Sequence, residues 1–290
     1  MNMKMDNFSN EINQLVEGII SMKKTLTQRI QNILLYPNFI FNLTVMGRKY
    51  RKNVNFLNSF TDKLIQIYAL NEENTKKKYE PTQKTLLDIL IEVFHEDKGP
   101  QKMIRDNLKT MILTASDTTS VTIDFAIFML ANFPELQEKV YTELLEIYGT
   151  VTPKSAQIKY EDLQHMNYLD CFIKETMRLF PAAPLIARHL TEDVKMGEFI
   201  LPKGVEVVLS ILSVHRNEKY WHNPLIFDPD RFLPEKIGTS YKNYYMPFSL
   251  GPRNCIGMKY AMISIKVILA TLIRTFIFKV DKRIQIDEIK

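Results

Sequence analysis

The longest run of helical periodicity in the chain covers about thirty residues, follows Gly99 and Pro100, and ends at Asn132. A run of this length exceeds the usual globular helix, so it favours a mainly helical fold. The apolar residues that recur along it at helical spacing are Ile104, Leu108, Met111, Ile112, Ala115, Phe125, Phe128 and Met129.

The middle of this run, Thr114-Ala-Ser-Asp-Thr-Thr-Ser120, is a poor helix interior. Its hydroxyl groups can bond back to the carbonyls of the preceding turn, and its β-branched residues lose rotamer freedom in a helix, so we expect a local opening or kink. Taken alone, a kinked core helix is the simplest interpretation. However, Asp117 and Thr118 place an acid beside an alcohol among apolar residues, and a buried carboxylate there indicates a chemical role.

Helical patterns also cover residues 11–70, where Tyr36-Pro37-Asn38 interrupts them. The polar run from Asn71 to Pro81 has little to bury, so we expect an exposed loop. Further helices are predicted over 86–93, over 134–149 with Asn132 as its cap, and over 168–179.

After Pro181 the pattern changes to strands and turns. Leu185–Leu190 and Phe199–Leu201 are strand-like, and Val205–Leu209 pairs back after the turn Pro202-Lys-Gly204. The prediction is therefore a mainly α fold with a small antiparallel β-sheet, in a single domain over residues 1–290 without internal repeats. Its parts are a helix-rich region over 1–180, the small sheet over 185–212, and a cysteine loop with its following helix over 248–278.

Composition excludes several classes of protein. The net charge of +5 is spread along the chain without a dense basic tract interleaved with aromatic residues, so nucleic-acid binding is not expected. The two cysteines form no CxxC pair, which argues against a disulfide scaffold and favours a reducing compartment. The chain as written has neither a signal-peptide core nor ~20 consecutive apolar residues, so we do not expect an integral membrane protein.

The loop Phe248-Ser-Leu-Gly-Pro-Arg-Asn-Cys-Ile-Gly257 contains the clearest candidate site. We interpret Cys255 as an iron ligand, because Gly251 and Gly257 leave the nearby backbone free of Cβ atoms, as the approach of a flat cofactor requires. Arg253 would direct a cation toward an anionic group of the same cofactor. A helix is predicted directly after the loop, and its dipole would stabilise a thiolate by roughly 0.3–1 kcal/mol. The alternative for Cys255 is an ordinary buried thiol.

Glu175 and Arg178 lie three residues apart on the helix predicted over 168–179, so they share a face and can pair. An isolated pair of this kind usually lies on the surface and contributes little. A buried structural role needs a third partner, and the candidate is Arg231 in Phe227-Asp-Pro-Asp-Arg-Phe232. Cys171, on the same helix, is most simply a small buried apolar residue.

Taken together and in their order along the chain, the acid–alcohol pair, the Glu175–Arg178 spacing, the Arg231 segment and the cysteine loop resemble a cytochrome P450. The residues Tyr245-Met-Pro-Phe-Ser and Asn254-Cys-Ile-Gly257 are most similar to the animal microsomal clade that includes fatty-acid ω-hydroxylases. The resemblance implies a partial cytochrome P450 fold. It also implies a haem-thiolate monooxygenase, an oxidoreductase that inserts one oxygen atom from O2 into an apolar, lipid-like or xenobiotic substrate.

The resemblance assigns roles on the cysteine side of the cofactor. Cys255 would be the axial thiolate and metal ligand of the iron in haem b. Arg253 and Arg188 would meet the haem propionates, and Phe248 would shield the sulfur. The residues assigned to cofactor binding are Cys255, Arg253, Arg188, Phe248, Gly251, Gly257 and Ala115. Those assigned to a buried structural triad are Glu175, Arg178 and Arg231.

On the opposite side of the cofactor, Asp117 and Thr118 would be catalytic residues that direct protons and water to oxygen. Thr114 and Ala115 stand where the clade often has Glu followed by Gly, so the ester bond that some members form between Glu and haem cannot form here. Ala115 is small enough to let oxygen approach. The residues that would line the substrate pocket are Ala182, Ala183, Pro184 and Leu185.

The resemblance further implies electrons from NADPH through NADPH-cytochrome P450 reductase, with cytochrome b5 as a second candidate partner. It implies a microsomal location at the cytosolic face of the endoplasmic reticulum membrane, with membrane association inferred from the family only. The matching part begins near the middle of the family fold, so the family's membrane anchor, first strands and early helices are expected to be absent. The chain stops at Lys290, so the family's final hairpin is also expected to be absent. Two alternatives stay open: a truncated, catalytically silent fragment or isoform, and a helical interaction protein without cofactor.

Overall fold

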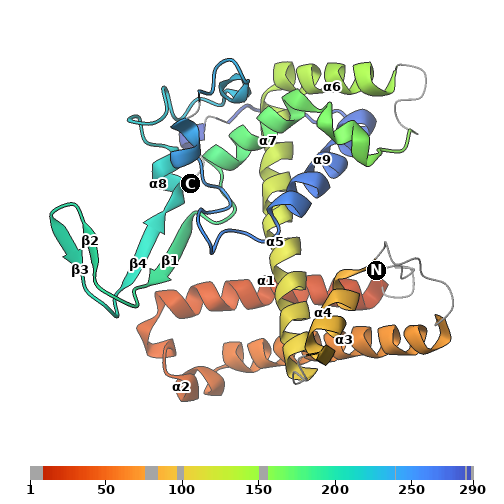
Figure 1. Ribbon diagram of the computed structural model, residues 1–290, viewed down its shortest axis with the longest axis vertical. Helices are drawn as coiled ribbons and strands as arrows, with labels where there is room; N and C mark the ends of the chain where they lie inside the picture. The colour runs from red at the N-terminus through yellow and green to blue at the C-terminus, as the bar shows by residue number, and fades with distance from the viewer. Residues whose placement is uncertain are drawn as a thin grey trace. The chain divides into compact units, whose positions relative to one another are not determined.

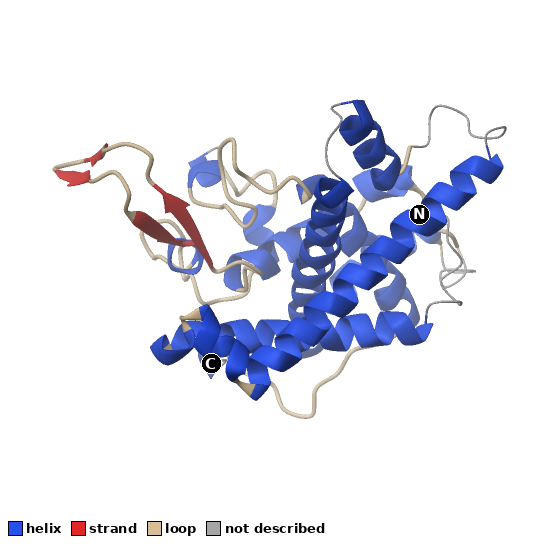
Figure 2. Cartoon of the chain, turned by 90° about the horizontal axis from the view of Figure 1, so that it is seen from below, coloured by secondary structure: helices blue, strands red, loops and turns tan. Residues whose placement is uncertain are grey.

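The computed structural model describes residues 9–75, 84–96, 101–149, 156–238, 240–284 and 286–288. The chain divides into two compact units, residues 1–114 and 115–290, and each is described by itself. The structure is mostly helical with small antiparallel strand pairs, which confirms the predicted fold class (Figures 1 and 2). The single-domain organisation stays a prediction. No helix in the described part of the chain is both long and apolar enough to cross a membrane.

The first unit is built from helices. Its elements are α1 (Ser9–Gln31), η2 (Ile33–Leu35), α2 (Asn38–Leu43), α3 (Val45–Thr75), α4 (Leu86–Glu96) and the first part of α5 (Gln101–Asn132). Helix α1 packs along α3, and Leu15, Leu57, Leu64, Leu87 and Leu108 are buried in the shared core. Pro37 precedes α2, in agreement with the predicted break.

Two expectations about the first half of the chain are changed by the structure. The loop predicted over 71–81 is wrong for residues 71–75, which form the end of α3, while residues 76–81 lie outside the described part. Gly99 and Pro100 also lie outside it. Helix α5 is uninterrupted across Thr114–Ser120, so the predicted opening is wrong. The hydroxyls of Thr114 and Thr122 each donate to the carbonyl four residues earlier, at 2.7 and 3.0 Å, without ending the helix.

The second unit has a helical core made by the end of α5, α6 (Pro134–Tyr148), η3 (Tyr160–Gln164), α7 (Asn167–Leu179) and α9 (Met258–Thr275). Helices α6, α7 and α9 pack against one another. The fully buried side chains at their junction include Val140, Leu144, Phe172, Ile173 and Leu269. The predicted cap of α6 is wrong by one residue: Phe133 is the N-cap, and Asn132 instead accepts a hydrogen bond from the Ile284 N–H at 2.9 Å.

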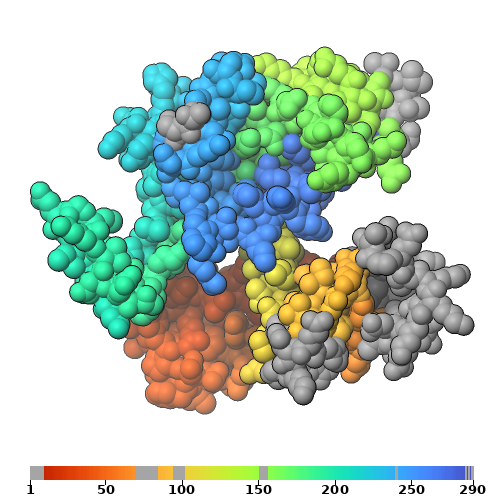
Figure 3. All heavy atoms as spheres, in the orientation of Figure 1, coloured from red at the N-terminus to blue at the C-terminus, as the bar shows by residue number. Residues whose placement is uncertain are grey.

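Two separate strand pairs replace the single predicted sheet. Strand β1 (Leu185–His189) pairs antiparallel with β4 (Glu206–Ser210), with Leu185 opposite Ser210. Strand β2 (Val194–Met196) pairs with β3 (Phe199–Leu201) in a hairpin that stands away from the rest of the second unit (Figure 3). The short helix α8 (Ile211–His215) follows β4 and returns the chain toward the end of α7. Three short 3-10 helices complete the description: η4 (Pro229–Phe232), η5 (Ser240–Asn243) and η6 (Ile286–Glu288).

Candidate functional site

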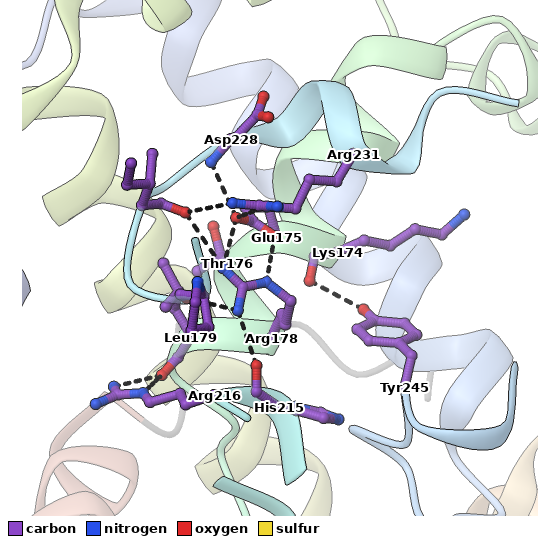
Figure 4. Close-up of polar contacts among 12 residues, drawn as sticks. Lys174, Glu175, Thr176, Arg178, Leu179, His215, Arg216, Asp228, Arg231 and Tyr245 are labelled. Atoms are coloured by element: carbon purple, nitrogen blue, oxygen red, sulfur yellow. Dashed lines mark hydrogen bonds and ion pairs between the residues drawn. The ribbon is translucent and has the colours of Figure 1, made fainter. Parts of the chain in front are cut away.

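A fully buried ion pair lies at the centre of the second unit. The Arg178 Nε and Nη2 atoms donate to the two carboxylate oxygens of Glu175 at 2.7 and 2.8 Å, and both side chains are 0% exposed. Arg231 on η4 donates to Glu175 Oε1 at 3.3 Å, and the Asp228 N–H donates to the same oxygen at 2.9 Å (Figure 4). The structure thus brings Glu175, Arg178 and Arg231 together, and one carboxylate joins α7 to η4.

Both arginines also bind main-chain carbonyls. Arg178 Nη1 donates to the carbonyls of His215 and Pro224 at 2.8 and 2.7 Å. Arg231 donates to the carbonyl of Asn223 at 2.8 Å. Burial raises the pKa of Glu175, while the adjacent guanidinium groups and the Asp228 N–H oppose that rise. This network fixes the irregular segment between α8 and η4 against α7.

An aromatic cluster adjoins the network. Trp221, Phe232 and Cys171 are its buried members, and Tyr241, Tyr244 and Tyr245 pack against them. The Arg178 guanidinium carbon lies 5.1 Å from the Trp221 ring centroid. Cys171 is buried, as expected, and burial raises the pKa of its thiol to about 11, so it is protonated at neutral pH.

The cysteine loop has a defined backbone geometry. The Cys255 N–H donates to the Phe248 carbonyl at 2.9 Å, which closes the loop, and the Cys255 side chain is exposed. Gly251 has φ +83°, a left-handed conformation that favours glycine. Gly257 is the N-cap of α9 with φ −86°, and a Cβ added there would lie 3.8 Å from Cys255 Sγ, an ordinary contact. Conformational freedom is therefore required at Gly251 but not at Gly257.

The two arginines predicted beside the cofactor differ in their surroundings. Arg188 on β1 donates from Nη2 to Ser249 Oγ at 3.1 Å, so the strand is tied to the cysteine loop. Arg253 is exposed and makes no hydrogen bond or ion pair with the described residues. An exposed thiol with two guanidinium groups on or beside its loop suits a cofactor that combines a metal with carboxylates.

Other predicted site residues lie on α5 and around β1. Asp117 is half-buried, and Thr118 and Ala115 are exposed. The expectation that the Asp117 carboxylate is buried is therefore wrong. Ala182 is half-buried, and the next three residues, Ala183, Pro184 and Leu185, are exposed where the chain enters β1. Phe248 is half-buried and packs against the helical core of the second unit.

A shallow hollow of about 500 Å³ lies elsewhere, over α6, α7 and η4. Its lining is acidic, and includes Glu135, Glu138, Glu143, Glu146 and Asp230. Glu143 accepts the Tyr168 and Leu169 N–H groups at 2.6 and 3.0 Å, so this carboxylate caps the start of α7. The hollow contains none of the residues predicted to line a substrate pocket.

The structural roles of three residues in and around the cysteine loop were not predicted from the sequence. His215 Nε2 accepts the Met246 N–H at 2.9 Å, and the Tyr245 hydroxyl donates to the Lys174 carbonyl at 3.0 Å. Ser249 has φ +63°, a conformation that few non-glycine residues adopt. The only signal in the sequence was the position of Ser249 within the cysteine loop and of Tyr245 just before it. Contacts between distant residues and backbone angles leave no local sequence pattern.

Comparisons with known proteins extend these observations. The family model described as cytochrome P450 matches residues 1–290. The chain is 34% identical over 284 residues to cytochrome P450 4c21 of Blattella germanica, covering 93% of the chain and 55% of that relative. It is 33% identical over 281 residues to cytochrome P450 4V2 of Homo sapiens, covering 92% and 53%. The chain spans about half the length of the curated relatives it matches.

Proposed function

The chain belongs to the cytochrome P450 family, and on this premise we propose that Cys255 is the axial ligand of a haem iron in a monooxygenase. The observation that supports the proposal most is the cysteine loop itself. Its thiol is exposed, its backbone is closed by the Cys255–Phe248 hydrogen bond, and its left-handed turn at Gly251 leaves no Cβ in that bend. These properties leave the sulfur accessible to a flat ligand.

When bound, a thiolate-ligated haem supplies the activation of O2. The chain's own residues bind and orient that group. Cys255 would provide the sulfur, and Phe248, which packs against the helical core, would shield it from the protein side. Arg253, which has no partner among the described residues, and Arg188, which reaches the loop through Ser249, would neutralise the propionates.

Residues on α5 would serve the oxygen side. Asp117 and Thr118 are neighbours on one helix, and their partial exposure leaves them able to exchange protons with water. Ala115 lies one turn earlier with a side chain small enough for a ligand to approach. The substrate would be apolar, lipid-like or xenobiotic, in contact with the small residues Ala182 to Leu185.

The electron supply and location are inferred from the family. We infer NADPH as the electron source through NADPH-cytochrome P450 reductase, with cytochrome b5 as a second donor, and a microsomal location at the endoplasmic reticulum membrane. The names of the relatives, cytochromes P450 4c21 and 4V2, support the family premise and leave the substrate to experiment.

The test is haem reconstitution of the purified chain, followed by reduction and addition of CO. The expected result is the Soret band of a thiolate-ligated complex, lost in Cys255→Ala and retained in Cys171→Ala, which removes the other, buried thiol. Equal haem content and equal spectra for both variants would overturn the assignment and leave a helical protein with an ordinary exposed thiol.

A further inference from the structure

His215 connects the buried ion-pair network to the cysteine loop. It ends α8 and is 0% exposed. Its carbonyl accepts a hydrogen bond from Arg178 Nη1 at 2.8 Å (Figure 4). Its ring Nε2 accepts the Met246 N–H at 2.9 Å. One residue therefore contacts α7 through its main chain and the start of the loop through its side chain.

From Met246 the hydrogen bonds continue to the cysteine. The Met246 carbonyl accepts the Ser249 N–H at 2.9 Å, and the Phe248 carbonyl accepts the Cys255 N–H at 2.9 Å. A displacement of Met246 would therefore move the turn that contains Ser249 and Phe248. Because Phe248 holds the backbone of Cys255, the position of the sulfur depends on where Met246 is held.

The ring of His215 is suited to accept a hydrogen bond and not to carry a charge. Burial lowers its pKa to about 4, and the nearby Arg178 cation adds to this effect, while the carbonyls of Arg178 and Met177 oppose it. Its ring stacks on Tyr245, with centroids 5.4 Å apart. Because Nε2 is the acceptor, the neutral ring carries its proton on Nδ1, which is buried without a hydrogen-bond partner in the described structure.

Among the residues that the structure describes, few titratable groups face the ring. Helix α7 contributes Arg178, itself neutralised by Glu175, and the loop contributes the buried Tyr245, whose hydroxyl is bonded to the Lys174 carbonyl. Arg216, the next residue, turns away and donates to the Leu179 carbonyl at 2.6 Å. None of these side chains supplies the Met246 N–H with an alternative acceptor.

We propose that His215 is a positioning residue of the cysteine loop, whose neutral Nε2 holds Met246 and, through it, sets the place of Cys255. That His215 orders the loop rests only on the hydrogen bonds among His215, Met246, Phe248 and Cys255. The consequence for iron ligation rests on the proposed haem-thiolate function. Protonation or removal of Nε2 leaves the partly buried Met246 N–H without its acceptor and releases the first residue of the turn.

The direct test needs no variant. In the ¹⁵N-labelled chain, a scalar coupling across the N–H···N hydrogen bond is expected between Met246 N and His215 Nε2. The absence of that coupling at neutral pH, with His215 protonated on Nε2, would overturn the proposal.

Variants then test the consequence. In hydrogen exchange, His215→Phe is expected to lower the protection of the Met246 amide roughly tenfold, because the ring is kept and the acceptor lost. His215→Gln, whose side-chain oxygen can replace Nε2, restores it. His165→Phe, at the exposed histidine that caps the end of η3, is the matched control and leaves the protection unchanged. Equal protection in His215→Phe and the control would contradict the proposal.

With haem added, His215→Phe is expected to convert several-fold more of the CO complex to a form without thiolate ligation, and His215→Gln to reverse this. A chain that binds no haem in any variant would refute the proposed function, while the exchange data would still decide the role of His215. Normal exchange protection in His215→Phe together with altered ligation would refute positioning through Met246.

Discussion

A single change at the Glu175 carboxylate is expected to destabilise the second unit strongly. It accepts hydrogen bonds from Arg178 Nε and Nη2, from Arg231 Nε and from the Asp228 N–H. Glu175→Gln keeps the size of the side chain and one acceptor oxygen but removes the charge. Arg178, which is 0% exposed, would then be a buried cation without its anion.

Removing one partner of a buried ion pair costs ~3–5 kcal/mol. The three carbonyls that also accept from Arg178 remain, and the retained amide oxygen can still serve Asp228, so we expect the lower end, about 3 kcal/mol. With a urea m-value of ~2 kcal/mol/M, the unfolding midpoint of this unit would fall by ~1.5 M.

The fluorescence of Trp221 reports this transition, because it is the single tryptophan of the chain and its ring lies 5.1 Å from Arg178. The control is Glu135→Gln, which breaks an exposed pair with Arg283 at 3.4 Å in the same unit and should cost less than ~1 kcal/mol. Equal midpoints for Glu175→Gln and Glu135→Gln would refute the view that this network stabilises the fold.

Three further predictions concern the surroundings of the loop. Folding lowers the pKa of His215 from 6.5 to about 4, so its contribution to the free energy of unfolding is fully present above pH ~6.5 and falls by about 3 kcal/mol toward pH 4. Urea titrations across this pH range should show a smaller decrease in His215→Gln. Gly251→Ala should cost ~1–2 kcal/mol in the same assay, since its φ is +83°, whereas Gly257→Ala, at φ −86°, should cost less than half as much; the reverse order would contradict the geometry. Tyr245→Phe removes one hydrogen bond to the Lys174 carbonyl and should cost ~1 kcal/mol by Trp221 fluorescence, and no change would mean that this bond does not form in solution.

Local patterns predicted the local features of this fold. Apolar spacing located the helices, and the proline at residue 37 marked a real break, because both act within a few residues. Helix propensity predicted an opening at Thr114–Ser120, and this prediction was wrong. The helix is continuous there, and the Thr114 hydroxyl bonds back to the preceding turn without breaking it. The assumption that Asp117 is buried failed for a related reason, since periodicity does not tell which face of a long helix is covered.

Contacts between residues distant in sequence were mostly not predicted; the exception is Arg231, which was named as the partner of Glu175. The pairing of Glu175 with Arg178 follows from their spacing on one helix, but the contact between His215 and Met246 exists only once α8 has folded onto the end of α7. Similarly, a serine at positive φ leaves no signature, so Ser249 emerged only from the backbone.

The central claim, that Cys255 ligates haem iron, is tested most directly by resonance Raman spectroscopy of the haem-loaded chain labelled with ³⁴S-cysteine. We expect an iron–sulfur stretching band that moves to lower frequency with the heavier isotope, persists in Cys171→Ala and disappears in Cys255→Ala. A haem-loaded chain whose spectrum shows no isotope-sensitive band, or keeps that band in Cys255→Ala, would contradict the account.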